Sequence, residues 1–264
     1  MSKSFWKAGV TAAAAALLMA GAASAQSGVS FKDPANDDNG PGNYTYPTDQ
    51  VYKRGSFDMT GFNVDVKGKK ADFEVTFNTP LEDPWKMGGG FSVQMVFIFI
   101  DNAEGGNKQG PPGTNITFAE GNEWDKLIIL SPQPQGTVRT EVDAKMAAMK
   151  SSVIVPSRTK GAGRTISGSV DLDQLGAGDP STWGYQVVVQ SNEGFPDSTD
   201  LLTRKVNEYE GQHRFGGGTD TDCDPHAIDI LASDAEGQKT MLKYECNPDG
   251  TAKQPAVLKM VRKS

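Results

Sequence analysis

The chain has 264 residues, and its 33 acidic side chains outnumber its 26 basic ones to give a net charge of −7. An acidic protein repels phosphate backbones and anionic membrane surfaces, so we expect no nucleic acid among its partners. The same surface is compatible with cations and with neutral glycans. No internal repeat or linker is visible, and the length fits one large β-domain over residues 26–264.

Residues 1–25 have the features of an export signal. Lys3 and Lys7 are followed by a short apolar core at residues 8–22, and small residues precede the bond Ala25-Gln26. The apolar run is too short and too rich in alanine for a transmembrane helix, so we expect no membrane span. Cleavage near Ala25-Gln26 removes two lysines and no acid, which changes the net charge from −7 to −9. We expect a secreted or periplasmic protein.

Alternating apolar positions predict the first strands. Phe57–Val66 alternates and is interrupted at Gly61, which indicates a β-bulge. A tight turn at residues 67–70 leads into the alternating run Ala71–Asn78, so the pair is predicted to form a hairpin. Phe91–Ile100 is almost wholly apolar, as expected for a central strand that is buried on both faces.

The rest of the chain continues this β pattern. Further strands are expected at Lys126–Leu130, Val153–Val155, Thr165–Asp171, Gly184–Gln190 and Ile228–Leu231. Helical signal is sparse, with a candidate at Glu141–Lys150 and one turn at Leu172–Leu175. Many short strands separated by polar loops predict an all-β, antiparallel β-sandwich with long loops and one or two short helices.

Three oxygen-rich segments are candidate cation sites. Calcium takes six to eight hard oxygen ligands from carboxylates, amides and main-chain carbonyls, and segments rich in Asp, Asn and Gly can wrap such an ion. The spacing is not that of an EF-hand, and the alternative is a set of solvated loops whose Asx side chains form turns. The predicted calcium ligands are Asp33, Asp37 and Asp38 in the first segment, Asp101 after the apolar strand, and Asp220, Asp222 and Asp224 near the C-terminus.

Only two cysteines are present, Cys223 and Cys246. In an oxidising compartment an isolated pair most simply forms a disulfide, which would join the glycine-rich segment after Phe215 to the end of the chain. The alternative is a thiolate metal site, which needs more ligands than the sequence offers nearby.

Aromatic residues are candidates for sugar binding, because a flat ring can face a pyranose. The candidates are Trp85, Trp124, Trp183 and Tyr44. In a β-sandwich most such rings fill the core instead. Trp85 differs from the others because Pro84 and three following glycines place it in a loop.

Hydrolytic catalysis has little support. Among 33 acids, pairs of carboxylates are uninformative. His213 and His226 are the only histidines, and the chain lacks a Gly-x-Ser-x-Gly elbow and a metalloprotease helix motif. We therefore expect no enzyme.

Four motifs carry a family resemblance. In chain order they are DPANDDNGPGNYTYPT, FDMTGFNVDV, DPWKMGGGFSVQMVFIFID and FGGGTDTDCDPHAIDIL. Together they resemble the C-terminal binding module of glucodextranase, and similar modules are appended to some amylopullulanases. The resemblance spans about Val29–Leu258. It implies a sandwich related to the DOMON group and to family 9 carbohydrate-binding modules, regarded as a non-catalytic unit for binding or cell-surface attachment, partly by likeness to S-layer homology domains.

The matching positions fall in the first and last motifs. They are Asp33, Asp37, Asp38, Gly40, Pro41 and Gly42, and then Gly216, Gly217, Gly218, Asp220, Asp224, Pro225 and Asp229. Departures are Asp83 and His226, where relatives commonly have asparagine, and the cysteine pair. No glycosidase domain is attached, so a sugar function does not follow from a neighbouring enzyme.

The leading hypothesis is an exported, non-catalytic protein that binds carbohydrate or cell-envelope glycan. Calcium would order acidic loops from both ends of the fold around one ion. One alternative is a non-covalent haem protein for electron transfer, as in a branch of the wider group, with axial ligands from Met, Lys, His213 or His226. Haem is the less favoured cofactor, and the chain has no C-x-x-C-H motif. A second alternative is a structural component of cell-surface attachment or assembly.

Overall fold

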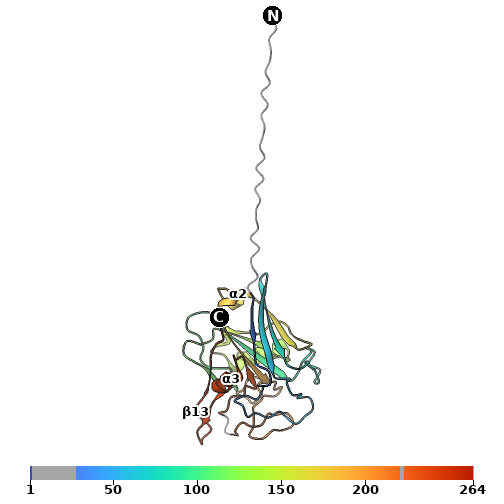
Figure 1. Ribbon diagram of the computed structural model, residues 1–264, viewed down its shortest axis with the longest axis vertical. Helices are drawn as coiled ribbons and strands as arrows, with labels where there is room; N and C mark the ends of the chain where they lie inside the picture. Colours follow the sequence, from blue (N-terminus) through green and yellow to red (C-terminus); the bar gives the residue numbers. More distant parts are fainter. Residues whose placement is uncertain (2–27, 221–222, 264) are drawn as a thin grey trace.

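Two five-stranded sheets pack face to face in the computed structural model of the protein (Figure 1). The structure describes Met1, residues 28–220 and residues 223–263, so the predicted signal peptide and its cleavage bond lie outside the described residues. The first sheet comprises, in spatial order, β1 (Val29–Lys32), β2 (Met59–Lys67), β3 (Lys70–Phe77), β9 (Thr165–Asp171) and β8 (Thr159–Ala162). The second comprises β11 (Asp229–Ile230), β10 (Gly184–Ser191), β4 (Gln94–Asp101), β6 (Lys126–Leu130) and β7 (Val153–Ile154).

The predicted hairpin is confirmed by β2 and β3. These strands pair antiparallel through Lys67 and Lys70, and their register shifts between Met59 and Gly61, where the bulge was expected. Gly68 occupies the turn with a φ of 64°, a conformation that glycine adopts without steric cost. Alternate residues of β3 are buried, so one face of this sheet packs on the core.

Strand β4 is central and fully buried, as its apolar sequence predicts. It pairs with β10 on one side and β6 on the other. Val96, Ile98 and Ile100 enter the core between the two sheets, whereas Phe97 and Phe99 enter a second core on the opposite face. The second sheet is therefore covered on both faces, which is why its strands do not alternate in polarity.

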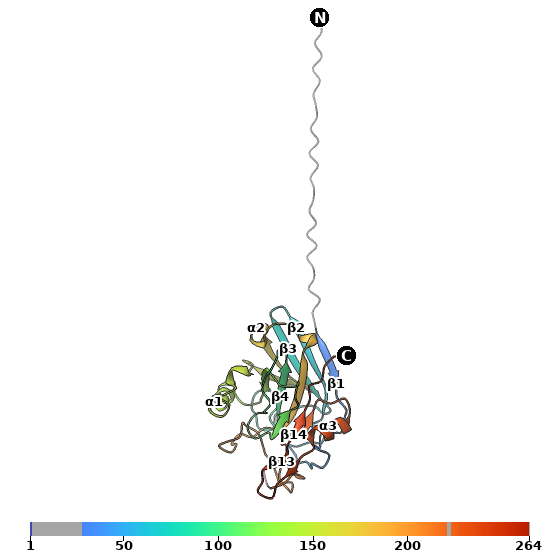
Figure 2. The same ribbon diagram turned by 90° about the vertical axis from the view of Figure 1, so that its left-hand side faces the viewer.

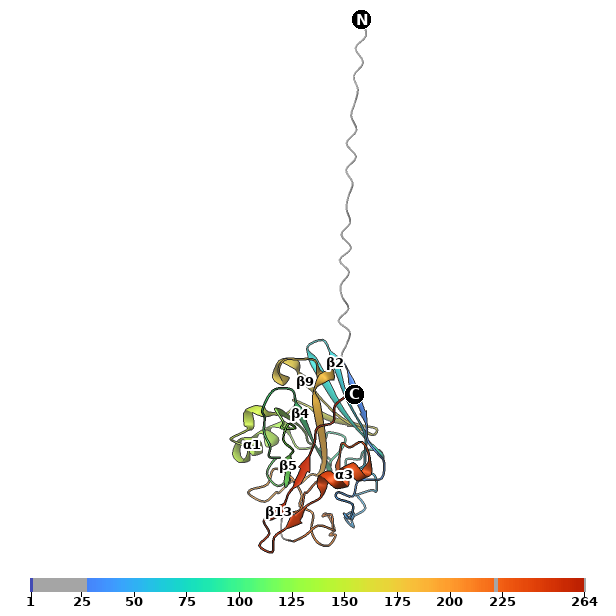
Figure 3. The same cartoon turned by 60° about the vertical axis from the view of Figure 1, so that its left-hand side comes forward.

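A third layer forms this second core. It contains α1 (Gln135–Lys145), α3 (Ala235–Leu242) and the parallel pair β5 (Ile116–Phe118) and β14 (Ala256–Leu258). Figures 2 and 3 show α1 and α3 on opposite flanks of the sandwich. The second sheet also contains one parallel pair, β6 with β7, so the antiparallel prediction holds for the sheets except at these two pairs.

The helices differ most from the prediction. Helix α1 begins six residues before the expected helix Glu141–Lys150 and coincides with only its first half, ending at Lys145. Its buried residues are Val138 and Val142. The Ala- and Met-rich segment after it forms turns and the 3₁₀-helix η1 (Lys150–Ser152). Helix α3 was not expected. Asp234 caps it by accepting a hydrogen bond from the Gly237 N–H at 2.8 Å.

The remaining elements are short. They are α2 (Leu172–Leu175), which matches the predicted turn, the 3₁₀-helix η2 (Pro180–Thr182), and the hairpin of β12 (Glu245–Cys246) with β13 (Ala252–Gln254). The described helices number three rather than the expected one or two. None of the helices in the described part of the chain has the length and apolar character needed to cross a bilayer.

The predicted disulfide is present. Cys223 and Cys246 are bonded, with their Cα atoms 5.8 Å apart. The bond attaches the last glycine-rich motif to the β12–β13 hairpin, which lies at the end of the molecule away from α2 (Figure 1).

Removing this disulfide should destabilise the fold measurably. The bond closes a loop with a sequence separation of 23, and the chain-entropy relation for such a loop gives about 3 kcal/mol. We expect the double variant Cys223→Ala/Cys246→Ala to lose about that much free energy of unfolding in urea titrations. An unchanged urea midpoint would show that the bond does not constrain the unfolded chain.

Candidate metal centre

The first and last motifs meet in the structure although they are far apart in the chain. Thr45 and Gly216 exchange two main-chain hydrogen bonds of 2.9 Å. The Tyr44 hydroxyl donates to the Pro225 carbonyl at 2.6 Å. Gly217 has a φ of 89°, and a Cβ there would lie 2.2 Å from the Asn43 carbonyl oxygen. The glycine-rich sequence is therefore required for close approach of the two motifs.

Four aspartates converge beside this junction. Asp33 follows β1, Asp37 lies four residues later, Asp58 directly precedes β2, and Asp229 opens β11. Carboxylate oxygens of Asp33, Asp37 and Asp229 all lie within 4.8 Å of one another. Asp58 is adjacent, and its charge raises the pKa of each of the other three. All four are buried, and Asp33 is the most exposed at 8%.

Main-chain N–H groups hold three of these carboxylates by one oxygen each. Asp33 Oδ1 accepts from the Ala232 N–H at 2.8 Å. Asp229 Oδ2 accepts from the Met59 N–H at 2.6 Å. Because Met59 begins β2 and Asp229 lies in β11, the second bond joins the two sheets.

Asp58 is held more firmly than the others. Its Oδ2 accepts from the Asn36 N–H and from the Asn78 side-chain amide, both at 2.8 Å. Asn36 has a φ of 71°, a left-handed conformation that is uncommon outside glycine and that Asn tolerates best. The Asp58 carboxylate thus fixes the turn that carries Asp37 toward the cluster.

The other oxygens of the cluster have no hydrogen-bond partner. These buried atoms are Asp33 Oδ2, Asp58 Oδ1, Asp229 Oδ1 and both carboxylate oxygens of Asp37. Asn39, two residues beyond Asp37, adds a buried amide oxygen that also lacks a hydrogen-bond partner. An unsatisfied buried acceptor costs about 1–3 kcal/mol and a charged one more, so several together need an explanation.

The pKa shifts of these aspartates also indicate that their charges lack compensation. Burial, followed by the charges of Asp37 and Asp58, raises the pKa of Asp33 far above its ordinary value. Burial and the neighbouring carboxylates likewise raise the pKa of Asp229. Asp37 has its pKa raised to about 6, mainly by burial and then by Asp58. Among the described residues, no basic side chain forms an ion pair with any of the four.

The donor set is chemically suited to a hard divalent cation. All candidate ligands are oxygens, and three carboxylates present them from two segments that are far apart in the chain. Such a set fits calcium or magnesium, whereas zinc and copper sites normally include nitrogen or sulfur ligands. An ion there would satisfy the unpartnered oxygens and neutralise charges that burial otherwise disfavours.

Helix α3 braces the centre through Gln238, which is buried. Its side-chain amide donates to the carbonyls of Asp37 and Gly40, and its Oε1 accepts from the Ile230 N–H at 3.0 Å. One side chain thereby attaches the acidic loop to β11. This contact also explains why α3, which the sequence pattern did not predict, lies against that loop.

The predicted ligands do not all gather at one place. Asp33 and Asp37 do, but Asp38 accepts a hydrogen bond from the Tyr46 hydroxyl, and Asp101 pairs with Arg262. Asp220 accepts from the Glu208 N–H at 3.2 Å. Asp222 lies outside the described residues. The last motif does contribute to the cluster, but through Asp229 rather than through Asp220 or Asp224.

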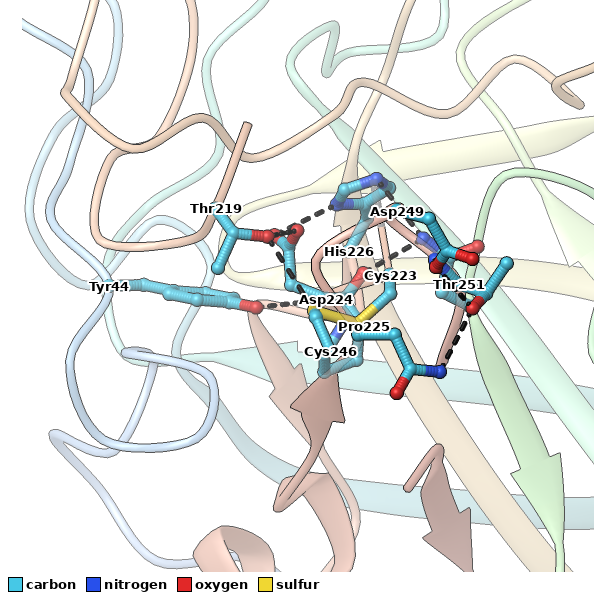
Figure 4. Close-up of a disulfide and its surroundings, with 11 residues drawn as sticks. Tyr44, Thr219, Cys223, Asp224, Pro225, His226, Cys246, Asp249 and Thr251 are labelled. Carbon is cyan, nitrogen blue, oxygen red and sulfur yellow. Dashed lines mark hydrogen bonds and ion pairs between the residues drawn. A yellow bond between two sulfur atoms is a disulfide. The ribbon is translucent and has the colours of Figure 1, made fainter. Parts of the chain in front are cut away.

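Asp224 belongs to a different buried network, next to the disulfide (Figure 4). Its Oδ1 accepts from the Thr219 hydroxyl at 2.8 Å, and its Oδ2 lies 3.6 Å from His226 Nδ1. That nitrogen accepts from the Val206 N–H at 3.1 Å. Burial raises the pKa of Asp224, and His226 opposes the shift. Asp224 Oδ1 is thus hydrogen-bonded within the protein, whereas its buried Oδ2 has no hydrogen-bond partner.

Sequence reasoning missed Asp58 and Asp229 as ligands. Both sit among apolar residues at positions that fold into the core, and both are fully buried. An aspartate inside a strand-like apolar run is costly unless something compensates it. The contrast between an aspartate and its apolar neighbours was the signal available in the sequence. It is a stronger signal than the density of acidic residues in an exposed loop.

Most of the predicted sugar-binding rings are buried. Trp124 is fully buried and donates its Nε1–H to the Gln109 carbonyl at 2.9 Å. Trp183 and Tyr44 are 4% and 5% exposed. These three rings therefore pack in the interior, as most aromatic residues of a β-sandwich do, and are not available to stack on a sugar. Trp85 alone of the four is partly exposed.

Comparison with known proteins agrees with the earlier resemblance. Residues 29–261 match the family described as the C-terminal binding module, SLH-like, of glucodextranase. No curated protein matches the chain. The family is one of binding modules and not of catalytic domains. Since the match covers most of the sequence, the chain belongs to the family of the SLH-like C-terminal binding module of glucodextranase.

Proposed function

We propose that this protein is an exported, non-catalytic binding protein that attaches to carbohydrate of the cell envelope. Support comes from its membership in a family of SLH-like binding modules. The N-terminal sequence agrees with export, because it has the features of a cleavable signal. The acidic surface favours a neutral glycan over an anionic one.

We further propose that calcium orders the loops of this module. The observation that carries this proposal is the group of buried carboxylate oxygens in Asp33, Asp37, Asp58 and Asp229 that lack both hydrogen bonds and basic partners. Asp33 and Asp58 lie at the two ends of the long connection 33–58, and Asp229 lies in β11. A bound ion would offset the entropy lost when that connection is ordered.

Calcium should raise the thermal stability of the purified protein. At a free concentration one hundred times the dissociation constant, a ligand that binds only the folded state adds about 2.7 kcal/mol. For a protein of this size, that corresponds to about 5–10 °C in Tm. Differential scanning calorimetry of chelated protein, with and without calcium, measures the shift. Isothermal titration calorimetry gives the stoichiometry.

The variant Asp37→Asn should remove most of this shift. Neither carboxylate oxygen of Asp37 has a hydrogen-bond partner, so the amide loses no existing contact. It also removes one of the like charges, so the chelated variant should melt at or above the chelated wild type. Asp143→Asn is the matched control, since Asp143 is exposed on α1. Equal calcium shifts in the two variants would contradict the proposed site.

The calcium effect should increase with pH. Asp33, Asp37 and Asp229 have folded-state pKa values above 3.8, so their protonated forms stabilise the ion-free fold. That contribution is complete below pH 3.8 and is lost as pH rises through about 6, the pKa of Asp37, and beyond. Without calcium, Tm should therefore fall between pH 5 and 8, and calcium should restore more of it at pH 8. Calcium shifts of the same size at both pH values would contradict this expectation.

Glycan attachment can be tested directly with wild-type protein. We expect it to sediment with insoluble neutral glucan or with purified envelope glycan, to be released by soluble fragments of the same glycan, and to liberate no reducing sugar. Heat-denatured protein is the control. If the protein binds none of these glycans with calcium present but sediments with envelope proteins, it is a structural assembly component instead.

A further inference from the structure

A shallow groove lies on the surface beside Trp85. It encloses about 360 Å³ and is lined by Trp85, Gln133, Asn192, Phe195 and Arg204, among others. Ligand pockets span about 300–1,000 Å³, so this groove suits a ligand of one or two sugar rings. Phe195 is 94% exposed, the highest value for any aromatic side chain among the described residues. A ring this exposed at the groove is accessible to a ligand.

The loop that carries Trp85 is rigidly held. Asp83 accepts from the Met87 N–H with one oxygen and from the Gly88 N–H with the other, both at 2.8 Å. An asparagine at this position would have only one acceptor oxygen, so the aspartate secures both bonds. The main-chain N–H of Trp85 donates to the Ser92 hydroxyl at 3.3 Å. The indole is thus positioned before any ligand arrives, which lowers the entropy cost of binding.

Aromatic neighbours support the indole from behind. Tyr52 and His213 each contact Trp85 edge-on, with ring centroids 6.2 Å apart. The guanidinium carbon of Arg204 lies 6.0 Å from the centroid of the Trp85 ring. The guanidinium lies over the ring, these contacts fix the orientation of the indole, and Trp85 is also a lining residue of the groove.

The polar side chains of the groove are close to neutral overall. Arg204 pairs with Glu193 at 3.4 Å, and both of these charges lie at the groove. Gln133 contributes an amide, which can donate to and accept from hydroxyl groups. Its amide nitrogen makes one long bond of 3.4 Å to Asn192 Oδ1, which a ligand hydroxyl could replace. Rings, an amide and a neutralised charge pair match the apolar face and hydroxyl rim of a pyranose.

We propose that this groove binds a neutral hexopyranose unit of the envelope glycan, with Trp85 and Phe195 as the rings that contact the sugar. The inference rests on the proposed function, since it names the surface through which the module engages its glycan. It assigns no role in sugar contact to the metal centre, whose carboxylates are buried.

Four variants test the groove in the sedimentation and competition assay with insoluble and soluble neutral glucan. Trp85→Ala and Phe195→Ala should each weaken binding by about tenfold or more, the effect of removing a central interface ring. Trp85→Phe should retain part of the affinity. Tyr209→Ala is the matched control, because Tyr209 is 73% exposed and is not among the lining residues. Phe195→Ala should fold like wild type, since its side chain is almost fully exposed.

The possible outcomes distinguish the groove proposal from the proposed function of the module. If wild type and Tyr209→Ala bind while Trp85→Ala and Phe195→Ala do not, the groove is the sugar site. If all four variants bind like wild type, the groove is excluded and the proposed glycan attachment stands. If wild type binds neither neutral glucan nor purified envelope glycan, both proposals fail; if it binds the envelope glycan alone, only the groove proposal fails. If Phe195→Ala abolishes a concentration-dependent dimer in ultracentrifugation and leaves glycan binding intact, the occupant is a second copy of the chain and not a sugar.

Discussion

Burial of four aspartates without a basic partner is the constraint on which the rest of this fold depends. Like charges in a low-dielectric interior repel one another, and each loses its hydration. The protein offers only partial compensation, because three main-chain N–H groups and one side-chain amide satisfy one oxygen on each of three carboxylates. The remaining oxygens require either protons or a cation. At neutral pH a divalent cation is the more effective partner, because it compensates several carboxylates together.

The position of the cluster explains its structural value. Asp33 and Asp58 stand at the two ends of the connection between β1 and β2, a long segment without strands or helices. Long irregular connections inside compact domains are uncommon unless they serve binding. An ion that joins both ends to Asp229 would close this connection at its base. The disulfide already constrains the last motif in a similar way, because it bonds that motif to the β12–β13 hairpin.

The sandwich was predictable because strands with one buried face have alternating apolar and polar residues in the sequence. Alternation in β2 and β3, with a glycine at the bulge, was sufficient to place a hairpin and its irregularity. The almost wholly apolar sequence of β4 indicated that both faces of the second sheet are covered, and α1, α3 and the β5–β14 pair form the additional layer. Helix α3 could not be predicted in the same way, since one of its two buried residues, Gln238, is polar and bonds to the acidic loop and to β11.

The buried carboxylate cluster was predictable only in part, for the opposite reason. Asp33 and Asp37 were found because acids cluster in their loop, but the same criterion selected Asp38, Asp101 and Asp220, which the structure pairs with other groups. Asp58 and Asp229 join the cluster because the start of β2 lies against β11 in space, which no local sequence pattern records. The aromatic residues teach the same lesson, because ring type did not distinguish the buried Trp124 from the partly exposed Trp85.

A continuous set of rings lies between the acidic loop and the groove. Tyr46, which donates its hydroxyl to Asp38, packs against Phe57 and Phe215 with centroids 5.9 and 4.9 Å away. Tyr52 contacts the same two rings and also Trp85. Phe57 directly precedes Asp58, so the residue beside the metal centre is also part of this packing. Since closely packed interiors transmit displacement instead of absorbing it, loosening of the acidic loop would reach the indole through contacts that are already formed. On this argument an ion bound at the acidic loop would hold the rings in place without itself touching a sugar.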